Sequence, residues 1–396
     1  MDQDATCASV FSRVHLDTPN LFASYRIGDC PHAGLLRPPW KMTGTQAVLV
    51  NAFDLLGNYR TRRFTSEIRE AENTLREYIH FDGPLMLDSG GFNFQKQDEI
   101  SIASLDVLEI GIEFAVDVSV VLDHPFLPTS TPEERETRWE NTVTNTEEMF
   151  EKLKDRDLPD YFQLMPVLHG HDPETLKQSL ARIVEIWGEN PPIVGIGSLA
   201  PLALNGNKRT AIDIICTVRR LLPNAHIHCF SLGSALLMLF AFYCGADTVD
   251  SQSWMISAAF KNVQLPGFPW TRFSSRERDK DSDKYEEKRN AFADRLLELI
   301  EQEGFAVKDW DEEKDWKIEN KSDALFYLDY LEHKDGEQHI HRRACHNLYA
   351  FNFEAKRVRE EKEKGVRALE TFIEGRMKSP VYRKTFEYAI QKISSK

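Results

Sequence analysis

Cysteine is scarce in this sequence, and no two cysteines form a CxxC pair. The six cysteines are instead scattered along the 396 residues. This scatter argues against both a disulfide framework and a cysteine-rich zinc knuckle. The positions are Cys7, Cys30, Cys216, Cys229, Cys244 and Cys345.

Long apolar runs are also absent. No stretch approaches the roughly 20 apolar residues that a membrane-spanning helix needs. The N-terminal sequence MDQDATCASVF has neither the basic start nor the apolar core of a signal peptide. We therefore expect a cytoplasmic protein without a membrane partner.

Basic residues are outnumbered, because 49 lysines and arginines face 63 acidic residues and the net charge is −14. The molecule as a whole should repel a polyanion, so a nucleic-acid partner would need a local basic surface. Two C-terminal stretches, KRVREEKEKGVR and GRMKSPVYRKTFEYAIQKISSK, are candidates. The alternative is that these residues only keep surface helices soluble.

Short apolar runs alternate with amphipathic helical segments through the first two thirds of the chain. The runs are mostly β-branched or aliphatic, as in strands buried on both faces. The helical segments carry start and stop signals, such as the capping box Thr131–Glu134 and the Asp172-Pro173 start of a segment that closes on Gly188. This alternation predicts βα units, and their number favours a closed (β/α)8 TIM barrel over an open sheet. The runs cover 47–53, 84–90, 118–123, 164–170, 193–199, 227–233 and 247–251.

Changes in charge and hydrophobic pattern along the sequence predict three regions. We expect an N-terminal extension over 1–44, the barrel over 45–360, and a basic helical tail over 361–396. Within the barrel region, a charged stretch and a polar connection predict an insertion near 272–322.

Polar residues stand where the predicted strands end. Asp88, Asp123, His169, Ser198 and Asp250 all follow or close an apolar run. Because barrel active sites lie at the carboxyl ends of the strands, we expect these side chains to share one rim. A single such residue would be explained as a turn cap, but three aspartates and a histidine are hard to explain in that way.

These motifs resemble the tRNA-guanine transglycosylase superfamily. DSGGFNF resembles its DSGGFQ, VVLDHPF its base-recognition strand, PVLHG its IVQGG, and VGIGSLAP the archaeal-type VAIGGIVP. The segment ending ADTVDSQSW resembles the one that carries the nucleophile, and ACHNLYAFNFE resembles the helices after the family's zinc site. Each match is weak alone, but together they occur in the family's order. They are most similar to the archaeal-type core and to the bacterial and phage branch that places 7-deazaguanine in DNA.

The resemblance implies a role for each motif residue. Asp250 would be the nucleophile that attacks C1′ and displaces guanine, and Asp88 would be the general acid and base. Asp123 would accept hydrogen bonds from the guanine N1–H and amine, and Phe92 would stack on the ring. Gly90 and Gly91 would let the flat base approach the backbone. The other base-binding residues implied are Asn93, His169, Gly170, Ser198 and Leu199.

Three features depart from the family. Its CxCxxC zinc ligands are replaced by DWDEEKDWKIENKSD, which leaves His346 without its partners, so we expect no zinc cofactor. Asn93 and His169 both stand where the family has glutamine. A metal cluster of His339, His341, Cys345 and His346 is the alternative. The HIH sequence at 226–228 suggests a metal hydrolase, but it begins a strand and is interpreted as structural.

The predicted function is a base-exchange glycosyltransferase that replaces guanine in a polynucleotide with a 7-deazaguanine base, through a covalent aspartyl-glycosyl intermediate. DNA is favoured over tRNA, because we expect the chain to lack both the zinc site and the C-terminal modules of the tRNA enzymes. The alternatives are a tRNA-guanine transglycosylase, a non-catalytic nucleic-acid-binding subunit, and an unrelated metal-dependent barrel hydrolase. A partner protein or a homodimer is a further expectation.

Overall fold

The computed structural model describes residues 10–28, 35–58, 60–94, 100–154, 156–204, 207–268, 271–273, 281–332 and 338–394. Cys7 and Cys30 lie outside these ranges. The chain divides into two compact units, and each is described by itself. Unit 1 comprises 1–27, 46–251 and 381–396, and unit 2 comprises 28–45 and 252–380.

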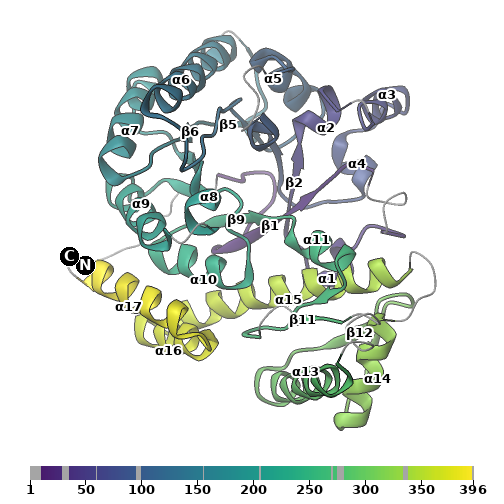
Figure 1. The fold of residues 1–396 in the computed structure, drawn as a ribbon. Helices are drawn as coiled ribbons and strands as arrows, with labels where there is room; N and C mark the ends of the chain where they lie inside the picture. The colour runs from purple at the N-terminus through teal and green to yellow at the C-terminus, as the bar shows by residue number, and fades with distance from the viewer. Residues whose placement is uncertain are drawn as a thin grey trace. The chain divides into compact units, whose positions relative to one another are not determined.

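Unit 1 is a parallel β-barrel surrounded by helices (Figure 1). Its strands follow the order β5-β4-β3-β2-β1-β9-β8-β7-β6. The (β/α)8 barrel expected from the sequence is therefore confirmed, and all seven apolar runs contain strands. The strands are β1 Asn20–Tyr25, β2 Ala47–Asn51, β3 Leu85–Asp88, β4 Val118–Val120, β5 Gln163–Met165, β6 Val167–Leu168, β7 Ile193–Ile196, β8 His226–Cys229 and β9 Thr248–Ser251.

Strand β1 was not among the seven predicted runs. It belongs to the segment that the sequence analysis set apart as an N-terminal extension, yet it pairs with β2 on one side and β9 on the other. All six of its residues are buried. The first described residues also serve the barrel, because Phe11 and Leu16 join the apolar cluster formed by the strands.

Pro166 explains how nine assigned strands make an eight-unit barrel. It separates β5 from β6, which are consecutive along the chain and stand at the two ends of the strand order. Proline has no N–H to donate to a ladder, so the pairing is interrupted at this residue. β5 pairs with β4 and β6 pairs with β7, so the two halves of one interrupted strand bring the ends of the sheet together.

The helices of unit 1 follow the strands in the order expected of βα units. The predicted capping box is present, because the Thr131 N–H donates to Glu134 and the Glu134 N–H donates to Thr131. Asp172 caps the next long helix, which ends at a left-handed Gly188. The helices are α2 Ala52–Leu56, α3 Arg63–Glu70, α4 Leu75–Ile79, α5 Ser104–Glu113, α6 Pro132–Lys154, α7 Pro173–Trp187, α8 Leu199–Leu204, α9 Lys208–Leu221, α10 Ala235–Cys244 and α17 Pro380–Ser394.

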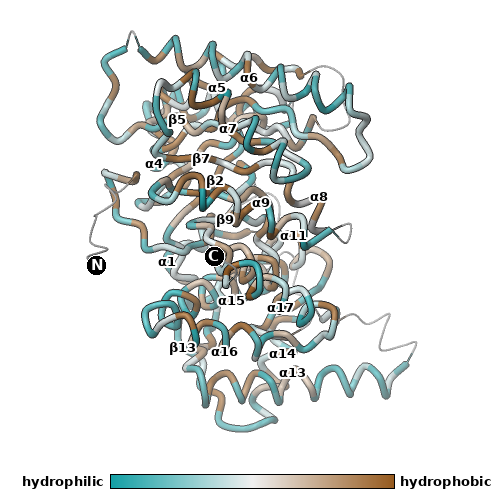
Figure 2. The backbone as a smooth tube through the Cα atoms, turned by 90° about the vertical axis from the view of Figure 1, so that its left-hand side faces the viewer, coloured by the Kyte–Doolittle hydropathy of each residue, from teal (hydrophilic) through white to brown (hydrophobic). Residues whose placement is uncertain are grey.

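Unit 2 is mainly helical and has an apolar core of its own. Two short hairpins, β10 with β11 and β12 with β13, accompany its helices. Figure 2 shows that α13 is hydrophilic over its first half and that apolar residues enter its second half, where Phe292, Leu296 and Leu299 are fully buried. The elements are α1 Trp40–Thr43, α11 Ser253–Ala259, β10 Asn262–Val263, β11 Thr271–Arg272, α13 Ser282–Glu303, β12 Val307–Asp309, β13 Lys314–Trp316, α14 Lys321–Glu332, α15 Gln338–Glu363 and α16 Val366–Arg376.

A helical C-terminal region follows the barrel strands, as the sequence predicts. The boundaries expected at 45, 360 and around the insertion remain predictions. Within the described part of the chain, no helix combines the length and apolar character that crossing a membrane would require.

A buried ion pair beside β3 and β4 provides a test of the barrel. The Arg76 guanidinium donates to the Asp117 carboxylate and to the Gly83 carbonyl, and Asp117 also accepts from the Leu85 N–H at 2.6 Å. Arg76→Met should lower the free energy of unfolding by about 3 to 5 kcal/mol, since it leaves a carboxylate buried without its cation. Chemical denaturation measures the loss. The double variant Arg76→Met with Asp117→Asn should recover part of this stability. A loss below about 1 kcal/mol in Arg76→Met alone would show that the ion pair does not support the barrel.

Candidate active site

Parallel register brings the predicted site residues to one rim of unit 1. Asp88 ends β3 and stands opposite Asn51, the last residue of β2. Asp250 lies in β9, opposite Phe22 of β1. The remaining three residues stand just after their strands: Asp123 after β4, His169 after β6, and Ser198 after β7.

Asp88 is a carboxyl group whose surroundings favour its protonated form. Desolvation, followed by the nearby charges of Asp123 and Asp250, raises the pKa of Asp88 well above its usual value. Backbone N–H groups of Gly90 and Ser89 oppose this shift without cancelling it. Perturbation of a carboxyl pKa by burial and like charges is a common mark of an acid–base residue.

Asp123 is held by groups from two other loops. The Ser89 hydroxyl donates to its Oδ1 at 3.1 Å, and His169 Nε2 lies 3.1 Å from its Oδ2. Its side chain is nearly buried, so these contacts fix the carboxylate with few other partners. The sequence analysis placed His169 on the base, whereas the structure places its ring against Asp123.

Asp250 receives donors from two neighbouring strands and their loops. The Ser24 hydroxyl donates to Oδ2 at 2.8 Å, and the Ser231 N–H donates to Oδ1 at 2.6 Å. His228 Nε2 lies 3.4 Å from Oδ1. The sequence analysis took the HIH sequence to lie at the start of a strand, away from the site, but His228 is the third of the four residues of β8 and faces a site aspartate.

Gly90 and Gly91 are required by the protein's own packing. Gly90 has φ +91°, and a Cβ there would lie 2.8 Å from Phe53 Cβ. A Cβ on Gly91 would collide with the Asp123 carboxylate and lie 2.7 Å from its backbone oxygen. Close approach of a base to these glycines remains a prediction.

The other predicted base-binding residues lie around this rim. Phe92 is 60% exposed, in the 3-10 helix η1, Gly91–Phe94, which leaves its ring available for stacking. Asn93 donates to the Gly90 carbonyl at 3.2 Å, which stabilises the turn. Ser198 has φ +58° and begins the turn into α8, where Leu199 is fully buried. No ligand contact of these residues is shown.

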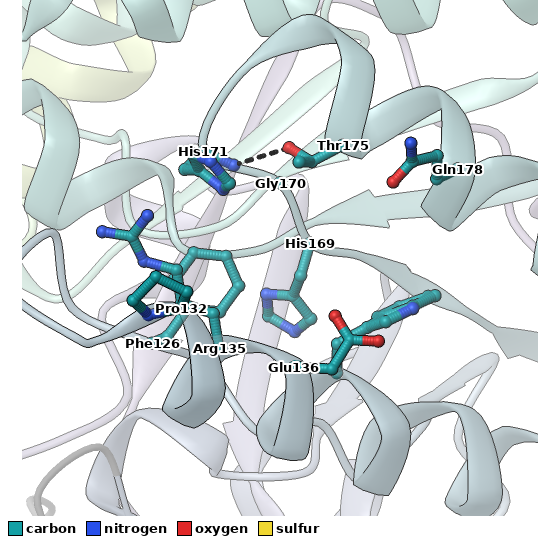
Figure 3. Close-up of a pocket in the computed structure, with 10 residues that line it drawn as sticks. Phe126, Pro132, Arg135, Glu136, His169, Gly170, His171, Thr175 and Gln178 are labelled. Atoms are coloured by element: carbon teal, nitrogen blue, oxygen red, sulfur yellow. Dashed lines mark hydrogen bonds between the residues drawn. The ribbon is translucent and has the colours of Figure 1, made fainter.

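A pocket of about 360 Å³ opens beside His169. Figure 3 shows His169 and Gly170 on the loop after β6, Arg135 and Glu136 on α6, and Thr175 and Gln178 on α7. Phe126 and Trp139 add aromatic faces to its wall. The pocket therefore offers flat apolar surfaces together with donors and acceptors, which suits a heteroaromatic ring.

The residues of unit 2 do not fit the zinc site of the resembled family. Both ring nitrogens of His346 face protein atoms, Nδ1 at 3.0 Å from the Tyr327 hydroxyl and Nε2 at 2.8 Å from the Gln264 carbonyl. Burial lowers the pKa of His346 to about 4, so the ring is neutral. Cys345 lies 3.7 Å from His341, but no group of three or more such side chains in the described ranges is arranged to hold a metal ion. The alternative cluster of His339, His341, Cys345 and His346 is thus not supported.

Comparison with known proteins shows the family of this chain. The family model described as queuine tRNA-ribosyltransferase matches residues 10–379, so the chain belongs to this family. The match includes β1, which the motif-based resemblance did not reach.

Curated relatives share about a quarter of the aligned residues. A protein of Methanobrevibacter smithii named tRNA-guanine(15) transglycosylase is 24% identical over 219 residues, which cover 55% of this chain and 32% of the relative. A protein of the same name from Archaeoglobus fulgidus is 27% identical over 222 residues, covering 55% of this chain and 43% of the relative. The matched segments thus span less than half the length of these relatives.

Gly91→Ala tests the contact between the DSGG turn and Asp123. The new Cβ should displace the Asp123 carboxylate and lower the free energy of unfolding by about 1 to 3 kcal/mol. Thermal unfolding measures this loss. Gly375→Ala is the matched control, since nothing lies within 4 Å of its added Cβ. A Gly91→Ala variant as stable as the wild-type protein would show that Asp123 need not hold this position.

Proposed function

We propose that this protein exchanges guanine in tRNA for another guanine-like base, with Asp250 as nucleophile and Asp88 as general acid and base. The observation that carries the proposal is the pairing of two different carboxyl environments at one rim. Asp250 accepts hydrogen bonds from Ser24 and Ser231, whereas the pKa of Asp88 is raised by burial and neighbouring charge. Carboxyl groups with divergent environments are typical of nucleophile and acid pairs in glycosyl transfer.

The reaction follows from these two states. An Asp250 carboxylate oxygen bonds to C1′ as the bond from C1′ to the guanine nitrogen breaks, and Asp88 gives its proton to the departing guanine. The incoming base then loses a proton to Asp88 and bonds to C1′, which releases Asp250. The protons balance over the cycle, and both aspartates return to their starting forms.

Asp123 supplies the selectivity for guanine in this proposal. An ionised carboxylate offers only acceptors, which match the N1–H and amine donors of guanine and do not match adenine. Phe92 and the pocket beside His169 provide surfaces for the ring. The target guanine must leave its stack to reach this rim, as in other enzymes that act on a base.

The choice of tRNA over DNA rests on the relatives. The sequence analysis favoured DNA, but the two relatives described above are named for tRNA. A 7-deazaguanine as the incoming base is kept as part of the proposal, and its support is the motif resemblance alone.

The raised pKa of Asp88 predicts a pH-dependent gain from Asp88→Asn. The folded protein retains a proton on Asp88 that the unfolded chain releases above about pH 4, so wild-type stability falls as pH rises from there towards the folded-state pKa. An amide does not titrate and removes this loss. Thermal unfolding at about pH 5 and about pH 8 should therefore show an advantage of the variant that grows with pH. A difference independent of pH would contradict the raised pKa.

Substitution of the three aspartates should separate their roles. Asp250→Ala should abolish both exchange and the covalent adduct, because it removes the atom that bonds to C1′. Asp88→Asn should reduce exchange by about 10²- to 10⁴-fold while polynucleotide binding is retained. Asp123→Asn should weaken guanine recognition, because an amide donates where the site needs acceptors.

The measurement offers labelled guanine with tRNA and, separately, with DNA, and detects the adduct by denaturing electrophoresis. Label in tRNA supports the proposal. Label only in DNA would show that the polynucleotide substrate is DNA and not tRNA. Exchange by Asp250→Ala would show that the nucleophile is misassigned. Wild-type protein that binds both polynucleotides and labels neither would favour a non-catalytic subunit.

A further inference from the structure

Behind Asp250, a buried chain of hydrogen-bonding groups ends at His228. His228 Nδ1 lies 2.9 Å from the Thr248 hydroxyl, and the same hydroxyl lies 2.9 Å from His226 Nε2. His228 Nε2 lies 3.4 Å from Asp250 Oδ1, and the described residues give this buried nitrogen no hydrogen bond. One end of the imidazole is therefore anchored, and the other faces the proposed nucleophile.

The number of protons available decides which groups in this hydrogen-bonded chain donate and which accept. The Thr248 hydroxyl has one proton, so it can donate to at most one of the two histidines. If His228 carried its proton on Nδ1, the bare Nε2 lone pair would face a carboxylate, which is repulsive. With the proton on Nε2, the ring faces Asp250 with an N–H, accepts from Thr248 through Nδ1, and leaves Thr248 to accept from His226 Nε2.

The same arrangement occurs behind Asp123. His169 Nδ1 lies 3.0 Å from the Ser198 hydroxyl, which accepts from the Phe126 N–H at 3.1 Å. Ser198 can therefore still donate its proton to Nδ1. In that tautomer the His169 Nε2 carries the N–H, and it faces Asp123 Oδ2 at 3.1 Å. The side chains of both histidines are fully buried.

We propose that His228 and His169 are positioning residues whose Nε2–H groups face and orient the carboxyl groups of Asp250 and Asp123. The proposal rests on the function proposed above and gives each of these two carboxyl groups a donor that fixes its position. The contacts at 3.1 and 3.4 Å are charge-to-dipole pairs rather than aligned hydrogen bonds, and such contacts often tighten when substrate binds.

The proposal explains why three neighbouring carboxyl groups can have different roles. A donor that faces a carboxylate stabilises its charged form, and a like charge nearby destabilises it. Asp250 and Asp123 each have a histidine donor, whereas the side-chain partner of Asp88 is the amide of Asn51, at a longer 3.3 Å. The raised pKa of Asp88 agrees with this distribution.

Packing alone does not account for the choice of histidine. The His228 ring lies edge-on between Phe22 and Phe230, with ring centroids 5.7 and 4.6 Å away. An aromatic hydrocarbon would fill such a position without bringing a polar nitrogen into the barrel. A buried N–H is costly unless something uses it, and the acceptor in reach is Asp250.

The test compares three substitutions at His228. Glutamine extends an amide N–H about as far as Nε2, asparagine places one only near Nδ1, and phenylalanine has none. We expect His228→Asn and His228→Phe to slow covalent adduct formation in a single turnover by about 10- to 100-fold with tRNA affinity unchanged, and His228→Gln to restore the rate to within about fivefold. Phe230→Leu is the packing control, because it loosens the same ring without removing a donor.

His169 should show a different kinetic signature. His169→Phe should raise the KM for guanine by about 10-fold or more, with a smaller effect on the rate of adduct formation, because Asp123 reads the base and does not attack the sugar. His169→Gln should recover most of the affinity. Thermal unfolding of every variant separates these effects from loss of folded protein.

Histidine nitrogen chemical shifts give a readout that does not depend on activity. Both rings should carry their proton on Nε2 in the wild-type protein. The Nδ1–H tautomer, or glutamine variants no better than asparagine and phenylalanine, would overturn the positioning role while leaving the exchange reaction intact. Wild-type protein that exchanges no base would overturn the proposed function and this inference with it.

Discussion

Repulsion among three carboxyl groups is the constraint around which the rim of this barrel is organised. Asp88, Asp123 and Asp250 are close enough that the last two raise the pKa of the first. Such a group of charges is stable only if donors compensate some of them and a proton neutralises another. The serine hydroxyls, the Ser231 N–H and the two buried histidines meet the first requirement, and the raised pKa of Asp88 meets the second.

Barrel closure converts this local chemistry into a defined geometry. Asp250 lies in β9, and its donors come from β1 and from the loop after β8. These two strands pair with β9 on its two sides. The strand interrupted at Pro166 brings the ends of the sheet together on the opposite side. The positions of the carboxyl groups therefore depend on strand pairing around the whole ring, and not on any single loop.

Sequence patterns were sufficient for the fold and for the location of the rim, but not for the contacts within it. The β-branched runs are long enough to predict buried strands, and the aspartates at their ends could be recognised without a structure. Strand β1 was missed because NLFASY contains polar residues and lies outside the matched motifs, although the barrel buries all of it. The role of His228 was missed because its partner is set by register between strands, which a local pattern does not contain. The requirement for glycine at position 91 was missed for the same reason, because it is set by contact with Asp123, which lies 32 positions further along the sequence.

The hydrogen bond from Ser24 to Asp250 joins residues 226 positions apart. Contacts of such long sequence separation form late in folding, because the loop entropy must be lost before they can stabilise anything. A chain with an incomplete barrel has the aspartate but not its donors, and its carboxylate is an ordinary solvated one. Under the proposed function, reactivity towards a sugar is therefore coupled to completion of the fold, and partly folded chains are inactive. The return of base exchange during refolding would then report the pairing of the first and last strands.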